Sequence, residues 1–506
     1  MAARPKKWIP YSELQIEMGI DFVTKVGVNI NDGLTYCRRP PFFPPEIYPE
    51  FQHGETKLDK DNHVYGAVRK LLYNMGLDKE HFGKKEWNPF AGIIKQGNLV
   101  VIKPNFVIHH NGGKENIDAV VTHGSVLRPL IDYALLALNG TGEIIIGDAP
   151  QANGNFDQII QKNGVRELVD YYQQRGENVK VYDFRKNWYP HGFKTGTRVE
   201  LPGDPHGYRR INLKERSFLQ DLPHKERLYG ADFDRQFVVD KHTNGHEYLY
   251  SGSVLEADVV ISVPKLKTHR KAGVTINSKN MVGANGDKNY LAHYRVGTPS
   301  HGGDEYPDGL PLLTRMVYRL NRFGFDNMLV KNTMLSRIGY LAMMGPFEVL
   351  RRAIKRLFHY DYMMGHGDWH GNDTVWRMCL DLNQILRYAD KSGKIRDTQQ
   401  RHIISIVDGI VAGQEDGPLR PTAYSAGCLA GGVDCLFEVD YTCIYMMGFA
   451  PEKLKIISRA MASGALHFKK PEEKDVCCTV NGRLTDYKSV NMHFLPQQYW
   501  RGYIER

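Results

Sequence analysis

Short apolar runs alternate with helix-length segments in the first half of the chain, and this rhythm restricts the fold more than any other feature. Three runs rich in Val and Ile have the length of buried strands: 99–107, 142–150 and 179–183. The two segments between them carry apolar residues at helical spacing: 122–137 and 156–172. This order is typical of parallel strands joined by right-handed crossovers. We therefore predict an α/β fold with a mostly parallel sheet flanked by helices.

Composition divides the rest of the chain. A Pro-rich and aromatic start predicts an arm around the main domain, and a basic amphipathic stretch predicts a helical insertion. The predicted order is an N-terminal arm (1–94), a first α/β half with a central basic loop (95–310), a basic helical insertion (311–372), a second α/β part (373–465) and a C-terminal tail (466–506). A helix at 374–389 and a strand at 402–413 carry the α/β pattern into the second part.

Bulk properties exclude several classes of protein. The net charge of +9 over 506 residues is too small for a nucleic-acid-binding signature. Seven cysteines include no C-x-x-C pair, so an iron–sulfur cluster is not expected. The first residues have no apolar core of a secretory signal, and no apolar run is long enough to cross a bilayer. These observations predict a cytoplasmic protein, and they leave the oligomeric state open.

The stretch 258–286 is the most unusual part of the sequence. A β-branched run, 259–263, is stopped by Pro264 and followed at once by five basic residues and a histidine. Small and amide residues are interleaved with the cations, so the stretch offers hydrogen bonds as well as charge. A solvated basic loop is the simpler interpretation. We favour a site for an anionic small molecule that carries a phosphate or a carboxylate.

Polar residues follow four of the predicted strands. They are Lys103 with Asn105, then Asp148, then the group from Lys265 to His269, and finally Asp408. The carboxyl ends of parallel strands meet at one edge of a sheet, where α/β proteins bind their ligands. A single Asp at such an end is usually a turn former. Because polar residues of both charges follow four predicted strands, we predict that they line one shared crevice.

Each crevice residue has an expected role. We expect the anion to be held by Lys265, Lys267, Lys279 and Asn280, with Lys103 and Asn105 opposite. His269 should stay neutral beside so many cations and could accept a proton; His123 is the other candidate base. Asp148 would orient the histidine. A divalent metal held by His123, Asp148 and His269 is an alternative, although no close spacing links the three.

The stretch 311–360 suggests a second kind of function. It carries nine Lys and Arg against two acids, Asp326 and Glu348, on an amphipathic background. The simpler interpretation is a helical insertion whose basic face lies in water. The alternative is peripheral contact with an anionic membrane surface, in which case the protein could be a non-catalytic binding or assembly component.

Several motifs together resemble one family. VIKPNFV, THGSVLRPLID, IIIGDAPQ, VPKLKTHRKAGVTINSKNMVG and IVDGIVAGQEDGP occur in the order typical of the family called domain of unknown function 362, across most of residues 95–465. The resemblance implies that the functional residues include Lys103, Asn105, His123, Asp148, Lys265, Lys267, His269, Lys279, Asn280, Asp408 and Asp434. Many members carry a ferredoxin module, which has no counterpart among these cysteines.

Two further expectations come from resemblance alone. Similar proteins occur with genes for cell-surface polysaccharides, which implies a link to that metabolism. The T-H-x-x-x-x-R-P pattern at 122–129 also resembles lactate racemase-like proteins. That likeness implies acid–base chemistry at a carbon next to a carboxylate, or a nucleotide-derived cofactor.

Overall fold

Each central strand buries side chains on both faces, and this places the sheet between two helical layers. In β2 (Leu99–Pro104), Val100 and Ile102 pack into one hydrophobic core and Val101 into another. Strands β3 (Glu143–Asp148) and β10 (Val259–Val263) alternate in the same way, because successive side chains of a strand point to opposite faces.

The structure is a computed structural model that describes residues 25–51, 57–112, 114, 116–192, 197–230, 234–358 and 365–506. Part of the predicted N-terminal arm (1–24 and 52–56) and the end of the stretch 311–360 lie outside the described residues.

The main sheet has eleven strands in the described part of the chain, in the order β17-β16-β1-β15-β14-β10-β2-β3-β4, with β11 and β12 paired alongside β14. The five strands from β14 to β4 run parallel. The α/β fold with a mostly parallel sheet is therefore confirmed. The remaining strands of this sheet are β1 (Val26–Ile30), β4 (Val179–Asp183), β11 (Lys265–His269), β12 (Gly273–Thr275), β14 (His402–Gln414), β15 (Thr422–Val433), β16 (Val476–Val480) and β17 (Arg483–Thr485).

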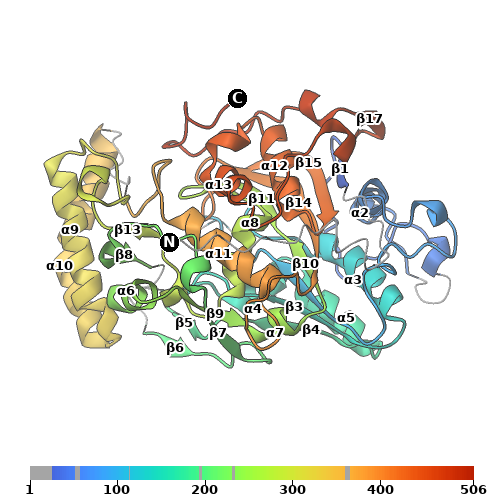
Figure 1. The fold of residues 1–506 in the computed structure, drawn as a ribbon, viewed down its shortest axis with the longest axis horizontal. Coiled ribbons are helices and arrows are strands. Elements are labelled where there is room, and N and C mark those ends of the chain that lie inside the picture. The colour runs from blue at the N-terminus through green and yellow to red at the C-terminus, as the bar shows by residue number, and fades with distance from the viewer. Residues whose placement is uncertain are drawn as a thin grey trace, which may run out of the picture.

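Helices cover both faces of the sheet (Figure 1). One face packs against α2 (His63–Asn74), α3 (Gly124–Leu138), α4 (Phe156–Lys162) and α5 (Val165–Gln174). The other face packs against α7 (Gly252–Glu256), α11 (Val375–Tyr388), α12 (Leu436–Met446) and α13 (Lys455–Ser463). The result is a three-layer arrangement with one core on each side of the sheet.

Strand β14 pairs with two consecutive strands. Its first half runs parallel to β10, and its second half runs parallel to β11, with Lys265 opposite Asp408. Pro264 lies between the two short strands, where the ladder is interrupted. The segment that the sequence predicts as a basic loop is therefore a strand, and it turns back through β12 as a hairpin.

Smaller elements make up much of the chain between β4 and α9. They are the antiparallel pairs β5 (Asn187–Trp188) with β6 (Val199–Glu200), β7 (Tyr208–Asn212) with β9 (Glu247–Ser251) and β8 (Leu228–Tyr229) with β13 (Tyr294–Arg295), and the helices α6 (Arg235–Thr243) and α8 (Asn277–Asn280).

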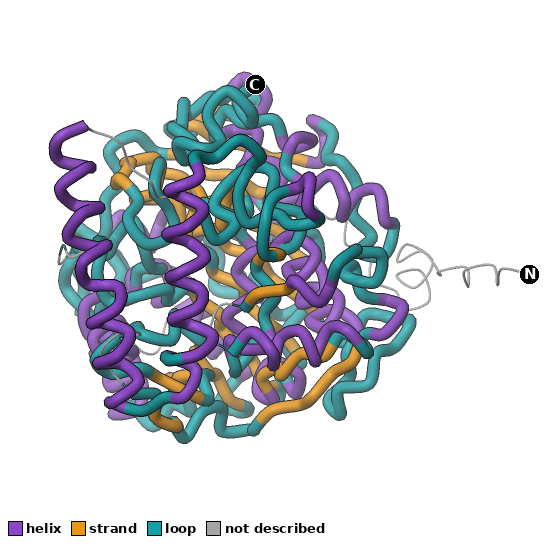
Figure 2. The backbone as a smooth tube through the Cα atoms, turned by 90° about the vertical axis from the view of Figure 1, so that its left-hand side faces the viewer, coloured by secondary structure: helices purple, strands orange, loops and turns teal. Residues whose placement is uncertain are grey.

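Helices α9 (Leu312–Asn327) and α10 (Met334–Phe358) form a hairpin along one side of the molecule (Figures 1 and 2). Its inner side packs through Leu329 and Tyr340 against Tyr189 and Ala152. No helix in the described residues is both long enough and apolar enough to cross a bilayer.

Candidate functional site

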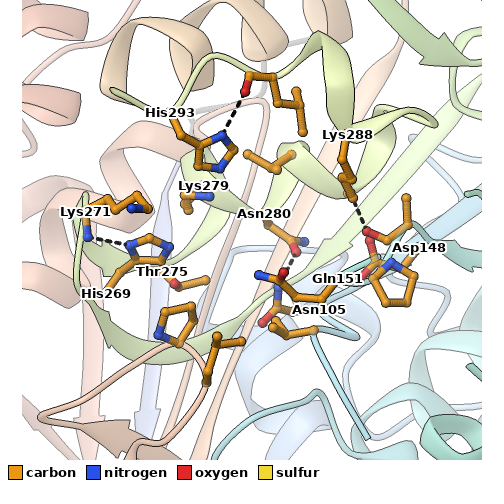
Figure 3. Close-up of a pocket in the computed structure, with 18 of the residues that line it drawn as sticks. Asn105, Asp148, Gln151, His269, Lys271, Thr275, Lys279, Asn280, Lys288 and His293 are labelled. Atoms are coloured by element: carbon orange, nitrogen blue, oxygen red, sulfur yellow. Dashed lines mark hydrogen bonds between the residues drawn. The ribbon is translucent and has the colours of Figure 1, made fainter. Parts of the chain in front are cut away.

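The carboxyl ends of β2 and β3 form one wall of a cavity of about 220 Å³. The hairpin β11–β12, helix α8 and the chain that follows α8 form much of the rest (Figure 3), and Asp368, Pro418 and Leu419 complete the lining. This is the edge at which parallel sheets bind ligands. The polar side chains that line the cavity include Asn105, Asp148, Gln151, His269, Lys271, Thr275, Lys279, Asn280, Lys288 and His293.

A buried ion pair closes the side of the cavity beside β2 and β3. Lys103 Nζ lies 2.7 Å from Asp148 Oδ1, and the backbone N–H of Phe106 donates to Asp148 Oδ2 at 2.6 Å. Gly283 packs directly on the pair, since a Cβ at this position would lie 1.8 Å from Asp148 Oδ1. Asp148 therefore balances the charge of Lys103, and does not orient a histidine as the sequence predicts. Removing either partner alone would strand a buried charge, at a cost of about 3–5 kcal/mol.

Apart from Asp148 Oδ1, which faces Lys103 in the ion pair, the polar atoms of the cavity wall that have no hydrogen-bond partner among the described residues include Asn105 Oδ1 and Thr275 Oγ1. Both residues are more than nine-tenths buried. Asn105 Nδ2 donates to Asn280 Oδ1 at 3.2 Å, so its amide oxygen remains as a free acceptor. A buried polar group without a partner costs about 1–3 kcal/mol. A ligand with a hydroxyl or N–H group would remove that cost.

Lys279 brings an unbalanced positive charge into the cavity. It lies at the end of the short helix α8, and its side chain makes no hydrogen bond or ion pair with any described residue. Burial lowers the pKa of its ammonium group, and the nearby Lys271 and Lys103 lower it further. Helix α8 is held in place by Asp440 of α12, which accepts the backbone N–H groups of Asn277 and Ser278 at 2.9 and 2.8 Å.

His269 presents an N–H group to the cavity. Its Nδ1 accepts hydrogen bonds from the backbone N–H groups of Lys271 at 3.0 Å and Ala272 at 3.2 Å. Nδ1 must then be unprotonated, and the hydrogen of the neutral ring lies on Nε2. Burial first, then the charge of Lys279, holds the pKa of His269 well below its usual value. The ring is therefore neutral, and in this tautomer it offers a hydrogen-bond donor, Nε2–H, where the sequence predicts a base.

His293 has the opposite tautomer. Its Nδ1 lies 2.9 Å from the carbonyl oxygen of Leu291, which can only accept, so the hydrogen lies on Nδ1. The lone pair on Nε2 is free to accept a proton. Burial and the charge of Lys279 hold the pKa of this ring well below its usual value too. His293 is not among the residues predicted for the crevice; its only signal in the sequence is a histidine in a polar, Gly-rich segment.

Two further lysines line the cavity. Lys288 Nζ donates to the carbonyl oxygen of Ala149 at 2.7 Å, and burial lowers its pKa to about 7. Lys271 Nζ lies 2.7 Å from a carboxylate oxygen of Asp368. With the Lys271 charge balanced in this way, Lys279 and Lys288 are the lysines of the cavity wall that have no carboxylate partner among the described residues.

The family model described as domain of unknown function (DUF362) matches residues 100–214 and 215–445. The two matched segments span more than half of the chain and contain every residue of the cavity wall named above. The chain belongs to the DUF362 family. The resemblance predicted from its motifs is confirmed.

Other comparisons add little to the DUF362 assignment. A protein of Thermotoga maritima with a crystal structure is similar at 11% sequence identity and a TM-score of 0.28, over 74% of this chain. The chain spans 55% of the length of that protein. A search of curated proteins found no match.

Some residues of the DUF362 pattern form a buried network outside the cavity. Lys265 Nζ lies 2.7 Å from Asp408 Oδ2 and 2.5 Å from the hydroxyl oxygen of Tyr36. The Tyr36 hydroxyl donates to Asp408 Oδ1 at 2.6 Å. Lys267 is also fully buried and donates to the carbonyl oxygen of Val120. Lys265 and Lys267 do not line the cavity, which corrects their predicted role as anion ligands.

His123 belongs to this network as well. It begins helix α3, its ring stacks on Tyr36 with centroids 4.1 Å apart, and its backbone N–H donates to Asp408 Oδ2 at 3.0 Å. The ring Nδ1 accepts from the backbone N–H of Ser125. Burial lowers the pKa of His123 to about 3. Its predicted role as a base in the crevice is not supported, because the ring packs in the core beside the cavity.

Asp434 lies at the other end of the sheet. It follows β15 and contacts the start of β14, where its Oδ2 lies 2.8 Å from His402 Nδ1 and its Oδ1 accepts the backbone N–H of Ile403. The cavity is at the opposite ends of the parallel strands. Asp434 therefore stabilises the fold at that end and is not a crevice residue.

The proposed metal ligands do not come together. His123 is in the buried network, Asp148 pairs with Lys103, and His269 uses Nδ1 for backbone hydrogen bonds. Among the described residues, no group of three or more His, Cys, Asp or Glu side chains is placed to hold a metal ion.

Proposed function

We propose that the cavity is the active site of an enzyme that acts on an anionic, hydroxylated small molecule. The observation that carries the proposal is the ammonium group of Lys279, which is buried in the cavity without a counter-ion from the described residues. A buried charge of this kind is costly unless it is paired. A phosphate or carboxylate group of a ligand would supply the missing partner.

The neighbouring groups suit the same ligand. The anionic group would receive hydrogen bonds from Lys279 and from Nε2–H of His269, and Lys288 adds positive charge. The unpartnered oxygen of Asn105 would accept a hydroxyl group of the ligand, and Thr275 can donate or accept. A phosphorylated or acidic sugar would meet these requirements. The occurrence of similar proteins with genes for cell-surface polysaccharides favours this choice.

The two histidines supply acid–base chemistry. His293 would take a proton at Nε2, while the Nε2–H of His269 and the ammonium groups stabilise the negative charge that develops on the ligand. Proton abstraction next to the anionic group is the reaction class that this layout favours. It is also the class implied by the likeness to lactate racemase-like proteins.

Calorimetric titration with sulfate tests the anion site, because the charge of sulfate does not change near neutral pH. Lys279→Met should weaken sulfate binding by about 10-fold to 100-fold, since a hydrogen bond to a charged group is worth about 1.5–3 kcal/mol. The matched control is Lys394→Met, which removes an exposed lysine from the segment between α11 and β14. Its affinity for sulfate should equal that of the wild type.

Two results would contradict the proposal. Equal sulfate affinity in Lys279→Met and the wild type would show that the anion does not bind at this ammonium group. His293→Gln should bind sulfate normally, since its Nε2 has no hydrogen to donate. A loss of binding in that variant would make His293 an anion ligand and remove it as the base.

A further inference from the structure

Exposed large apolar side chains are concentrated on the α9–α10 hairpin. In the described part of the chain there are fifteen such residues, and ten of them lie between Leu312 and Val349. The other five are scattered over the molecule: Ile47, Leu58, Val199, Leu484 and Leu495. Contiguous apolar surface of this kind marks an interaction site in soluble proteins.

The exposed residues follow the helical repeat on the outer side of the hairpin. We call this face the outer ridge, defined as Leu312, Met316, Phe323, Met334, Leu335 and Ile338. Leu335 is 80% exposed, whereas Tyr340 on the inner side is fully buried. Among the described residues, the inner side attaches the hairpin to the body of the protein through Tyr340, an ion pair of 2.5 Å between Arg322 and Glu305, and the hydrogen bonds of Asp326 and Asn332 to Tyr229 and Arg198. The outer ridge is therefore not needed for that attachment.

Positive charge accompanies the outer ridge. Of the basic residues in the stretch, Arg319 and Lys331 are exposed, and Arg319 falls within the apolar repeat of α9. One of the two acids, Asp326, accepts a hydrogen bond of 2.9 Å from the Tyr229 hydroxyl of the protein body. The two helices lie side by side (Figure 2). Their exposed side chains thus include large apolar residues together with the cations Arg319 and Lys331.

We propose that the outer ridge docks on a membrane surface that contains anionic lipids. The apolar side chains would enter the boundary between headgroups and acyl chains, and Arg319 and Lys331 would contact lipid phosphates. The charge argues for lipid over a second copy of this chain, because two copies of a basic face repel each other. The described helices lie on the bilayer surface in this proposal, in line with the absence of a spanning helix among them.

Vesicle flotation with the full chain tests the proposal. Vesicles of phosphatidylcholine with phosphatidylglycerol should carry the protein upward, vesicles of phosphatidylcholine alone should do so weakly, and added salt should weaken the binding. The variant Met334→Ser/Leu335→Ser/Ile338→Ser should reduce the bound fraction at least about tenfold. The control Leu484→Ser/Leu495→Ser removes exposed apolar residues elsewhere and should bind as the wild type does. Arg319→Glu/Lys331→Glu should abolish the preference for phosphatidylglycerol.

Three outcomes would overturn it. The wild type could fail to bind vesicles with phosphatidylglycerol, or the triple variant could bind them normally. Light scattering could instead show a wild-type dimer that the triple variant converts to a monomer, which would assign the ridge to a second copy of the chain. Sulfate affinity of the triple variant should equal that of the wild type, so this test fails or succeeds separately from the test of the cavity.

Discussion

The two histidines of the cavity differ in which ring nitrogen carries hydrogen, and backbone groups alone decide the difference. Two N–H groups face Nδ1 of His269, and one carbonyl oxygen faces Nδ1 of His293. The sequence predicts a neutral His269 from its cationic neighbours, and that inference needs only charge. It cannot predict the tautomer, because the tautomer depends on the turn that follows the residue.

The pKa of Lys288 predicts that anion binding depends on pH. The group is an ammonium ion below its pKa of about 7 and neutral above it. Sulfate affinity should therefore fall as the pH rises from about 6 to about 8, because the cavity loses a positive charge in this range. Titration calorimetry at several pH values measures the change.

Lys288→Met provides the control for this effect. The variant should bind sulfate weakly at all pH values, with most of the pH dependence removed. An unchanged pH profile in Lys288→Met would assign the titration to another group.

At the scale of elements, local sequence patterns predict well the strands and helices that pack against elements close to them in the chain. Strands β2, β3, β4 and β10 and helix α3 lie within a few residues of their predicted bounds. The predicted helix 156–172 is two helices, because Gly164 adopts a positive φ of 74° and ends the first one. Strand β11 is missed, since the sequence shows Pro264 but not the long partner strand β14 that continues past it.

Asp440 links the position of helix α8 to anion binding. Asp440→Ala removes an acceptor of hydrogen bonds from the two backbone N–H groups at the start of α8 and from the side chain of Asn277. Leaving these donors unsatisfied in the core should lower the free energy of unfolding by about 2–3 kcal/mol. Sulfate affinity should also fall, because Lys279 is carried by this helix. Urea unfolding and calorimetry give the two values.

Asp486→Ala is the matched control, since Asp486 accepts the backbone N–H of Lys488 at the exposed start of a one-turn helix. This substitution should lower the free energy of unfolding by at most about 1 kcal/mol and leave the affinity for sulfate unchanged. If Asp440→Ala destabilised the protein yet bound sulfate normally, α8 would not position the anion site.

At the scale of the whole molecule, the parallel strands separate two polar clusters. The cavity lies at their carboxyl ends, and the pair His402–Asp434 lies at the start of β14. The sequence predicts a shared crevice from four strand ends, and Asn105, Asp148 and His269 do line one cavity. Lys265 and Asp408 reach the same edge but neutralise each other in the core. Residue type and strand position predict which polar residues lie at this edge of the sheet. They do not predict which of the charged residues form ion pairs with other residues of the protein.

The pair at the far end should affect stability without affecting binding. The hydrogen bond to Asp434 raises the pKa of His402. The folded state therefore holds this proton more tightly than the unfolded state. The resulting stabilisation is complete below the unfolded pKa of about 6.5 and is lost as the pH rises through the folded pKa.

His402→Gln should consequently lower the free energy of unfolding at acidic pH and have a smaller effect at alkaline pH. Denaturant titrations of both proteins across this range measure the difference. If the free energies of unfolding of the two proteins differed by the same amount at all pH values, the imidazolium form of His402 would not contribute to stability. A change in sulfate affinity would mean that the two ends of the sheet are coupled.

Strand β1 lies between β15 and β16, and its residue Asn29 pairs with Thr479, 450 positions further along the chain. During synthesis on the ribosome, the backbone of β1 must remain without this neighbour until residues 476–480 have emerged. A nascent chain stalled before Val476 would display an unpaired strand edge, which other chains can join. Synthesis of the segment 476–480 is therefore also the step that protects this side of β1 against aggregation.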